Sequence, residues 1–197
     1  DLTDAGFQPY WYGFPWEAKI VDGVAHVVKH YAMGRQASEL SYVMPDKKTV
    51  YTTDDGTNRY FQKFVADHPG DLSEGTLYCS KFTQTTADGL YPHDSEWNIE
   101  WIEMGHSNDN TLHAAIEGLT FDKIFAEAAP VDGSCPVGFT SINTDSSSAD
   151  RGHECLQINA GFELHAAFFE TRRAAAMMGC TTEWNKWEGI TFSPSHH

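Results

Sequence analysis

The sequence predicts a mainly β fold with one clear helix, near residues 163–178. Over the first 85 residues, short runs rich in β-branched and aromatic side chains recur about every 8–12 residues. Pro45-Asp46-Lys47, Asp54-Asp55-Gly56 and Pro69-Gly70-Asp71 place turn-forming residues between these runs. Only one later segment has long helical spacing of its apolar residues. This pattern is typical of a β-sandwich, a barrel or a propeller.

The individual strands follow from composition and alternation. In the first half of the chain, strands are expected at residues 24–33, 40–44, 49–53, 60–65 and 76–82. Residues 97–104 (WNIEWIEM) alternate between apolar and polar side chains, which predicts one more strand. Together these segments make the first half of the chain a series of short, turn-connected strands.

The second half is mixed. Residues 121–129 (FDKIFAEAA) are expected to form a short helix, and the Ser-, Asp- and Gly-rich stretch after them a long loop. Residues 163–178 carry apolar groups at helical spacing, and Gly179 stands where a helix C-cap is expected. Residues 189–192 then predict a strand, followed by a hairpin turn at 193–195.

Charge and composition narrow the functional classes. The 197 residues carry a net charge of −15, so a polyanion such as nucleic acid would be repelled and sequence-independent binding to it is excluded. An excess of carboxylates suits hard cations such as calcium, although a soluble acidic surface explains the same composition. No apolar run is long enough to span a membrane.

The four cysteines form no CxxC pair, which disfavours a zinc site or a redox pair. Cys135 and Cys155 bracket a polar segment, and we expect a disulfide between them to close a loop insertion at 132–156. That bond would place the protein in an oxidising compartment, with Cys79 and Cys180 left as free thiols. The alternative is that Cys135 and Cys155 are ordinary thiols.

One group of acidic residues follows the strand pattern. If strands 40–44 and 49–53 pair as a hairpin, Glu39 comes near Asp54 and Asp55 at one end of the sheet. Three carboxylates and nearby backbone carbonyls would suit a calcium ion, which takes six to eight oxygen ligands. Alternatively, Asp-Asp-Gly is only a turn and Glu39 faces water.

A second acidic group lies close to the chain's end, in the stretch TTEWNKWEG. Glu183 and Glu188 both belong to it, and Glu188 is followed by Gly189 just before an expected strand. A carboxylate in that place can present an oxygen ligand at the rim of a sheet. A surface loop between a helix and a strand explains the residues equally.

Two stretches, residues 33–82 and 168–197, resemble the PhoX-like alkaline phosphatases, which are exported bacterial enzymes. The resemblance rests on the combination of MGR…E, TDDGTN, GDLSEGTLY and EGITFSP, in this order. It implies a single partial β-propeller domain over 1–197, with about three blades of antiparallel strands. It also implies calcium and iron ions in a central channel, where they assist the hydrolysis of phosphomonoesters.

The resemblance assigns roles to particular residues. Glu39 matches a metal-ligand glutamate, with Arg35 beside it as a phosphate contact. Asp54 or Asp55 matches an acidic residue after the next strand. Glu188 matches the Glu-Gly carboxylate of a later blade, and Glu183 is a weaker candidate for the same role.

The chain also departs from the family pattern. Ser38 replaces the usual histidine before the motif glutamate, and the Cys-Glu-Glu segment that supplies a thiolate to iron is absent. A propeller needs about 4–8 blades, so we expect an incomplete enzyme whose missing blades belong to the same polypeptide or whose edges other chains cover. The alternative function is a non-enzymatic, calcium-binding structural protein built from propeller-type blades.

Overall fold

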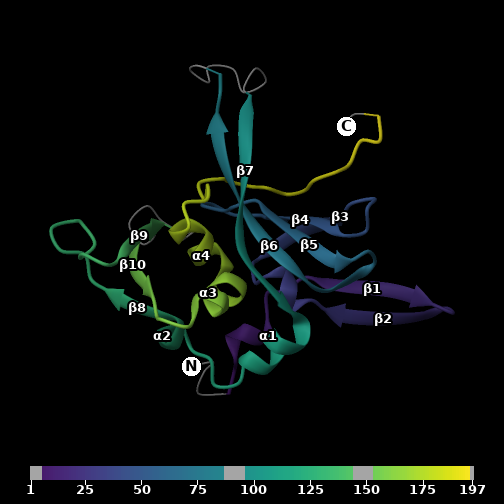
Figure 1. Cartoon of the computed structure of the whole chain (residues 1–197), viewed down its shortest axis with the longest axis horizontal. Coiled ribbons are helices and arrows are strands. Elements are labelled where there is room, and N and C mark those ends of the chain that lie inside the picture. Colours follow the sequence, from purple (N-terminus) through teal and green to yellow (C-terminus); the bar gives the residue numbers. More distant parts are fainter. Residues whose placement is uncertain (1–5, 87–95, 144–152, 196–197) are drawn as a thin grey trace.

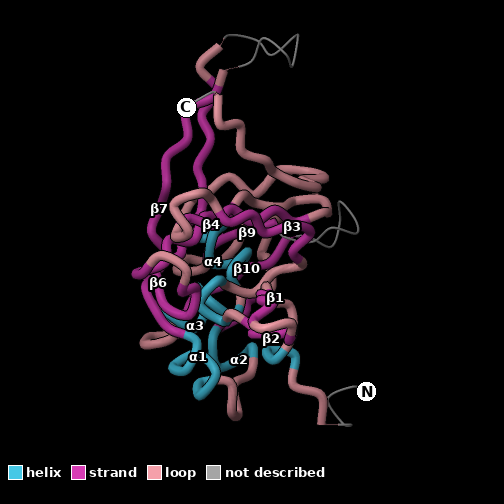
Figure 2. Tube along the Cα trace, turned by 90° about the vertical axis from the view of Figure 1, so that its right-hand side faces the viewer, coloured by secondary structure: helices cyan, strands magenta, loops and turns pink. Residues whose placement is uncertain are grey.

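The computed structural model describes residues 6–86, 96–143 and 153–195, and these residues form three antiparallel sheets. The largest contains the strands β3 (Ser38–Val43), β4 (Thr49–Asp54), β5 (Gln62–His68), β6 (Asp71–Gln84) and β7 (Trp97–Asn108), in that order. Each strand therefore pairs with its neighbours in sequence, as in a meander. In both views β6 and β7 extend beyond the other strands of this sheet (Figure 1 and Figure 2).

Two smaller sheets flank this one. A hairpin of β1 (Trp16–Val21) and β2 (Val24–Lys29) projects to one side of the molecule (Figure 1). The other small sheet has the order β8 (Phe125–Ala128), β10 (His153–Ile158), β9 (Thr140–Asn143). None of the described sheets closes into a barrel. Strands predominate over helices, which confirms the expected mainly β class.

The helices of this fold are short. They are α1 (Asp109–Ala115), α2 (Phe121–Ile124), α3 (Glu163–Phe169) and α4 (Thr171–Met177), with single 3₁₀ turns at Pro9–Trp11 (η1) and Tyr31–Met33 (η2). Figure 1 shows α3 and α4 between the small sheet of β8–β10 and the large sheet. Phe168 and Phe169 of α3 are fully buried there. Among the described residues, every helix is too short to cross a membrane.

The strands expected in the first half are present, with shifted ends. Residues 49–53 fall in β4, 76–82 in the longer β6 and 97–104 in the longer β7. The strand expected at 24–33 ends at Lys29 instead, because Ala32 and Met33 turn into the core and are buried. The β1 strand and the α1 helix were not expected from the sequence.

Three expectations for the second half are wrong. Only the first four residues of 121–129 are helical, because Phe125–Ala128 pairs with β10 as a strand. The loop expected at 132–156 is interrupted by β9 and the first residues of β10, which pair with each other, and its residues 144–152 lie outside the described residues. Residues 189–192 form no strand, and in the described part of the chain after α4 the only bridge is the isolated one between Trp184 and Arg59.

The helix expected over 163–178 is interrupted at Glu170, whose backbone (φ −124°, ψ 45°) leaves the helical region. The Glu170 carboxylate accepts a hydrogen bond from the Tyr10 hydroxyl at 3.0 Å and one from Arg173 at 2.8 Å. These long-range and local contacts hold the carboxylate inside the protein, and they accompany the break between α3 and α4. Helical spacing alone does not report such contacts.

Two disulfides cross-link the fold. Cys135 and Cys155 are bonded, which confirms the expected bridge. Cys79 and Cys180 are also bonded, so the expectation that they are free thiols is wrong. This second bridge joins β6 to the segment after α4, and no local sequence pattern indicates that these two elements are neighbours. Two disulfides fit a protein exported to an oxidising compartment.

A buried histidine joins the projecting hairpin to the body of the protein. His30 Nδ1 lies 2.9 Å from Asp109 Oδ2 and His30 Nε2 lies 3.3 Å from Glu17 Oε2. Asp109 also accepts the backbone N–H of Ala32. Burial lowers the pKa of His30, but the hydrogen bonds and charges of Asp109 and Glu17 outweigh it and raise the pKa.

This geometry predicts a pH-dependent stability. A histidine whose pKa is raised in the folded protein contributes its full stabilisation when the pH is below its unfolded-state pKa of about 6.5. This contribution is lost as the pH rises through the pKa of the folded state. Replacing His30→Asn should therefore lower the free energy of unfolding by about 2 kcal/mol at acidic pH. The difference should shrink in alkaline buffer. Urea unfolding of both proteins across this range measures it, and a difference independent of pH would contradict it.

Candidate metal and phosphate site

The β3–β4 hairpin brings the first acidic group together. Ser38 pairs with Asp54 and Leu40 with Thr53, so Glu39 lies at a β-bulge between two paired residues. A bulge re-aims the side chain that it carries, and such bulges are frequent beside functional sites. Glu39, Asp54 and Asp55 therefore share one end of the large sheet, because the expected hairpin forms.

A cavity of about 610 Å³ opens at this end of the sheet. Its polar lining residues are Gln36, Ser38, Glu39, Ser41 and Asp55, and we refer to it as the carboxylate cavity. The Ser41 hydroxyl lies 3.0 Å from the hydroxyl of Thr52, which fixes it on the strand pair. Carboxylates, hydroxyls and a carboxamide are all oxygen donors of the kind that calcium prefers.

Asp54 is completely buried beside this cavity. Arg59 Nε lies 2.9 Å from Asp54 Oδ1, so the two side chains form a buried ion pair. Burial raises the pKa of Asp54 to about 6, and the charges of Asp55 and Glu39 add to this effect, whereas Arg59 and a hydrogen bond from the Ala37 backbone oppose it. Burial and the neighbouring carboxylates therefore outweigh the arginine, and a cation here would favour the charged form of Asp54.

A lysine from the chain's C-terminal segment already sits among these carboxylates. Lys186 Nζ lies 2.9 Å from Asp55 Oδ1. The hydrogen bond and charge of Asp55 raise the pKa of Lys186, and the charges of Glu188 and Glu39 contribute to the rise. Glu188 is exposed and does not belong to the lining of the carboxylate cavity.

Backbone contacts hold the lysine in this position. Lys186 has a φ of 58°, and its N–H donates to the carbonyl of Gly56 at 2.8 Å. Trp184 and Arg59 exchange backbone hydrogen bonds of 2.8 and 3.1 Å. The Trp187 ring packs on Phe61, with centroids 4.6 Å apart. Glu183, by contrast, is exposed and accepts the N–H of Thr182, and it does not belong to the lining of the carboxylate cavity.

Arg35 lines a neighbouring cavity of about 340 Å³. Arg172, Arg173 and Glu170 line it too, so guanidinium groups outnumber carboxylates in what we call the arginine cavity. Arg35 Nε donates to the carbonyl of Tyr12 at 3.0 Å and Arg35 Nη1 to that of Phe169 at 3.4 Å. Arg173 already pairs with Glu154 at 2.7 Å and with Glu170 at 2.8 Å, and Arg35 Nη1 lies 3.8 Å from Glu170.

The approach of Arg35 to α3 and α4 depends on the glycine before it. Gly34 has a φ of 76°, and a Cβ there would lie 2.9 Å from Leu77 Cδ2. The Arg35 N–H then donates to the carbonyl of Phe168 at 2.9 Å and lies 3.0 Å from the Thr171 hydroxyl oxygen. The backbone under Arg35 is therefore fixed on both sides.

Sequence reasoning did not single out Gln36, which lines both cavities. It lies within the MGRQASE stretch, but no spacing rule marks it. Lys186 was also missed, because only the folded chain brings the C-terminal segment back to Asp55. Both residues could have been found only from the three-dimensional arrangement.

Two other polar groups lie away from this site. The ligand atoms of Asp67, Glu74 and His106, which are exposed on three adjacent strands, lie within 4.8 Å of one another.

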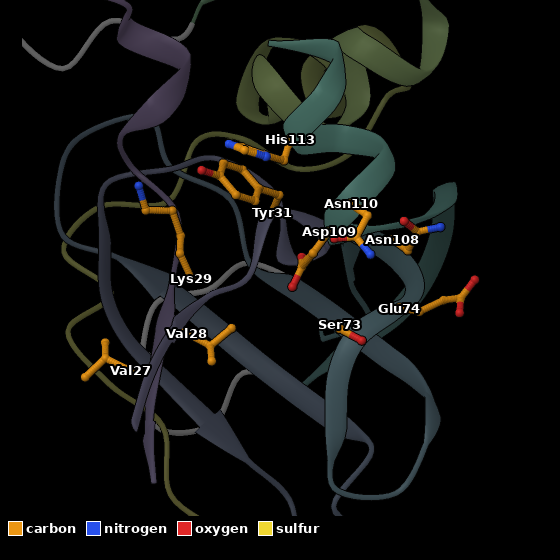
Figure 3. Close-up of a pocket in the computed structure, with 10 residues that line it drawn as sticks. All are labelled: Val27, Val28, Lys29, Tyr31, Ser73, Glu74, Asn108, Asp109, Asn110 and His113. Carbon is orange, nitrogen blue, oxygen red and sulfur yellow. The ribbon is translucent and has the colours of Figure 1, made fainter. Parts of the chain in front are cut away.

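Glu74 also borders a cavity of about 670 Å³ between β2, the start of β6 and α1. In Figure 3 its walls carry Lys29 and Tyr31 on one side and Asp109 and Glu74 on the other. None of the residues predicted from the sequence borders this cavity.

The donors suit the two metals of the resemblance unequally. The carboxylate cavity offers oxygen ligands, as calcium requires. All four cysteines of the chain are in disulfides, so none provides a thiolate for iron. The residues at this site therefore fit calcium, and they provide no basis for a step that involves iron.

Comparison with known proteins gives the same family as the sequence motifs. The family model for "alkaline phosphatase PhoX" matches residues 3–197. No curated protein and no solved structure shows significant similarity to the chain. The family match does not support the alternative of a non-enzymatic structural protein. Because the match covers nearly the whole chain, this protein belongs to the PhoX alkaline phosphatase family.

Proposed function

We propose that this chain forms the calcium-binding and phosphate-binding part of a phosphomonoester hydrolase. The observation that carries the proposal is the contact between two oppositely charged cavities, one lined by Glu39 and Asp55 and the other by arginines. A phosphomonoester is an anion whose reacting oxygens must meet a cation, so adjoining cation and anion sites are what its hydrolysis needs.

In this proposal Glu39 and Asp55 hold the calcium ion, with Asp54 behind them and Glu188 at the outer side. Bound calcium would polarise the phosphoryl oxygens as a Lewis acid. Arg35 orients the phosphoryl group through its guanidinium, whose fork matches the geometry of phosphate oxygens. Glu183 is the weakest candidate, because its carboxylate already accepts a backbone N–H.

We also propose that the described sheets are parts of a larger β-propeller. The consecutive antiparallel order of β3 to β7 agrees with the meander of a propeller blade. The projecting hairpin leaves Trp16, Ile20 and Val27 from 64% to 70% exposed, which is costly in water. Further blades of the polypeptide or other chains would cover such residues. In analytical ultracentrifugation, residues 1–197 alone should then oligomerise, and a stable monomer would contradict this.

Hydrolysis of a chromogenic phosphomonoester by the intact protein tests the proposed function. We expect activity in calcium, loss of activity with a calcium chelator and recovery when calcium is returned. Glu39→Gln should lower the activity at least about 100-fold, because it removes a metal ligand. The control is His106→Ala, which alters the separate Asp67–Glu74–His106 group. Activity that is indifferent to calcium would contradict the proposal.

A further inference from the structure

Gln36 stands out because its side chain is buried without a partner. It is only 7% exposed, and neither its Nε2 nor its Oε1 has a hydrogen-bond partner among the described residues. A buried carboxamide that lacks partners is costly, and such groups in folded proteins usually await a ligand or an ordered water.

The position of this carboxamide is fixed. The Gln36 backbone N–H donates to the carbonyl of Gly13 at 2.8 Å, and the preceding residue, Arg35, is bound to α3 as described above. A Cβ on Gly13 would lie 3.4 Å from the Gln36 carbonyl oxygen, so the two segments are in close contact. Gln36 therefore cannot leave the junction between the cavities without disturbing this backbone pairing.

Gln36 belongs to the lining of both the carboxylate cavity and the arginine cavity, with its carboxamide buried between them. A carboxamide has an acceptor oxygen on one edge and two N–H donors on the other. The oxygen is a ligand that calcium takes, and the N–H groups are donors for a phosphoryl oxygen. One glutamine can thus contact both species when they occupy adjoining sites.

We propose that Gln36 binds the substrate's phosphoryl group, with its Nε2 donating to a phosphoryl oxygen and its Oε1 facing the cation. This inference rests on the proposed function, since it requires calcium and phosphate at these two cavities. Gln36 would then be a second residue, besides Arg35, that contacts the phosphoryl group, and it would do so next to the calcium ion.

The test uses phenylphosphonate, a monoester analogue that resists hydrolysis, and the intact protein loaded with calcium. By isothermal titration calorimetry, Gln36→Leu should weaken phenylphosphonate binding about tenfold, the loss of roughly one hydrogen bond to a charged group. In the absence of ligands the same variant should melt about 3 °C higher, because it removes an unpaired buried amide.

Gln62→Leu is the matched control. Gln62 is also buried, but its Nε2 donates to the carbonyl of Met33 and its Oε1 accepts the Tyr60 hydroxyl. This variant should melt at a lower temperature, because it leaves those groups unpaired. A second variant, Gln36→Glu, keeps an oxygen for calcium and repels the phosphonate, so it should retain calcium binding and lose phenylphosphonate binding.

The outcomes separate the two proposals. Unchanged phenylphosphonate affinity in Gln36→Leu overturns the role of Gln36, and so does a fall in melting temperature as large as that of Gln62→Leu. The second result would show that Gln36 has a structural role, for example through an ordered water. If the wild-type protein binds no phenylphosphonate in calcium, the proposed function itself fails.

Discussion

Removing the Cys79–Cys180 bridge, which lies in the hydrophobic core, should cause a large loss of stability. The bridge closes a loop with a sequence separation of 101 residues. Chain entropy for a loop of that length corresponds to about 4.7 kcal/mol, because the cross-link restricts the unfolded chain. We therefore expect Cys79→Ser with Cys180→Ser to lower the free energy of unfolding by roughly that amount.

The other disulfide is the internal control. Cys135 and Cys155 are separated by 20 residues, for which the same relation gives about 3.3 kcal/mol. Urea unfolding of the two double variants, each compared with the wild-type protein, measures both losses. Equal stability of the Cys79–Cys180 double variant and the wild-type protein would contradict the assignment of this bridge.

Removing the Cys79–Cys180 bridge should also weaken calcium binding at the candidate site. Beyond Cys180, the Thr181 N–H donates to the carbonyl of Ser80 at 2.9 Å, and the Thr181 hydroxyl oxygen accepts the Phe82 N–H at 2.8 Å. This attachment begins the segment that places Lys186 beside Asp55 of the carboxylate cavity. Calcium affinity should therefore fall in the Cys79–Cys180 variant and remain closer to wild type in the Cys135–Cys155 variant.

The second large effect concerns calcium itself. Glu39→Gln should weaken calcium binding at least about 100-fold, because a neutral amide replaces a direct carboxylate ligand. Calorimetric titration of calcium into both proteins gives the two dissociation constants. Folding should be unaffected, since Glu39 is exposed in the absence of the ion.

Glu100→Gln is the control for this measurement. Glu100 is an exposed residue of β7 that pairs with Lys81 and lies outside the lining of the carboxylate cavity. Glu100→Gln therefore removes the same negative charge as Glu39→Gln, but at a different place on the protein. It should leave the calcium affinity within about twofold, because distant exposed charges are screened. An equal effect of the two substitutions would mean that calcium responds only to net charge, and the site would be wrong.

The parts of the site that the sequence predicts are the local ones. Glu39, Asp54 and Asp55 are joined by one hairpin, whose turn and alternation are visible in the residues between them. Arg35 was found through the family motif. The placement of Lys186 beside Asp55 and the pairing of Cys79 with Cys180 depend on contacts between distant parts of the chain, which no local pattern reports.

The same distinction explains the errors in the fold. Residues 125–128 have a helical composition, but pairing with β10 makes them a strand, since tertiary contacts outweigh weak propensities. Glu170 lies in a helical pattern, yet its contacts with Tyr10 and Arg173 accompany a break in the helix. No sequence pattern marks Gln36, because the observation that singles it out is a buried carboxamide without hydrogen-bond partners.

Calorimetric titration of phenylphosphonate into the intact protein, with and without calcium, tests the central claim most directly. If the carboxylate cavity holds calcium next to the anion site, calcium should tighten phenylphosphonate binding at least about tenfold, a coupling of about 1.4 kcal/mol. Glu39→Gln should abolish this coupling while leaving the weak binding measured without calcium. Equal phenylphosphonate affinity in the presence and absence of calcium would show that the two cavities do not form one site.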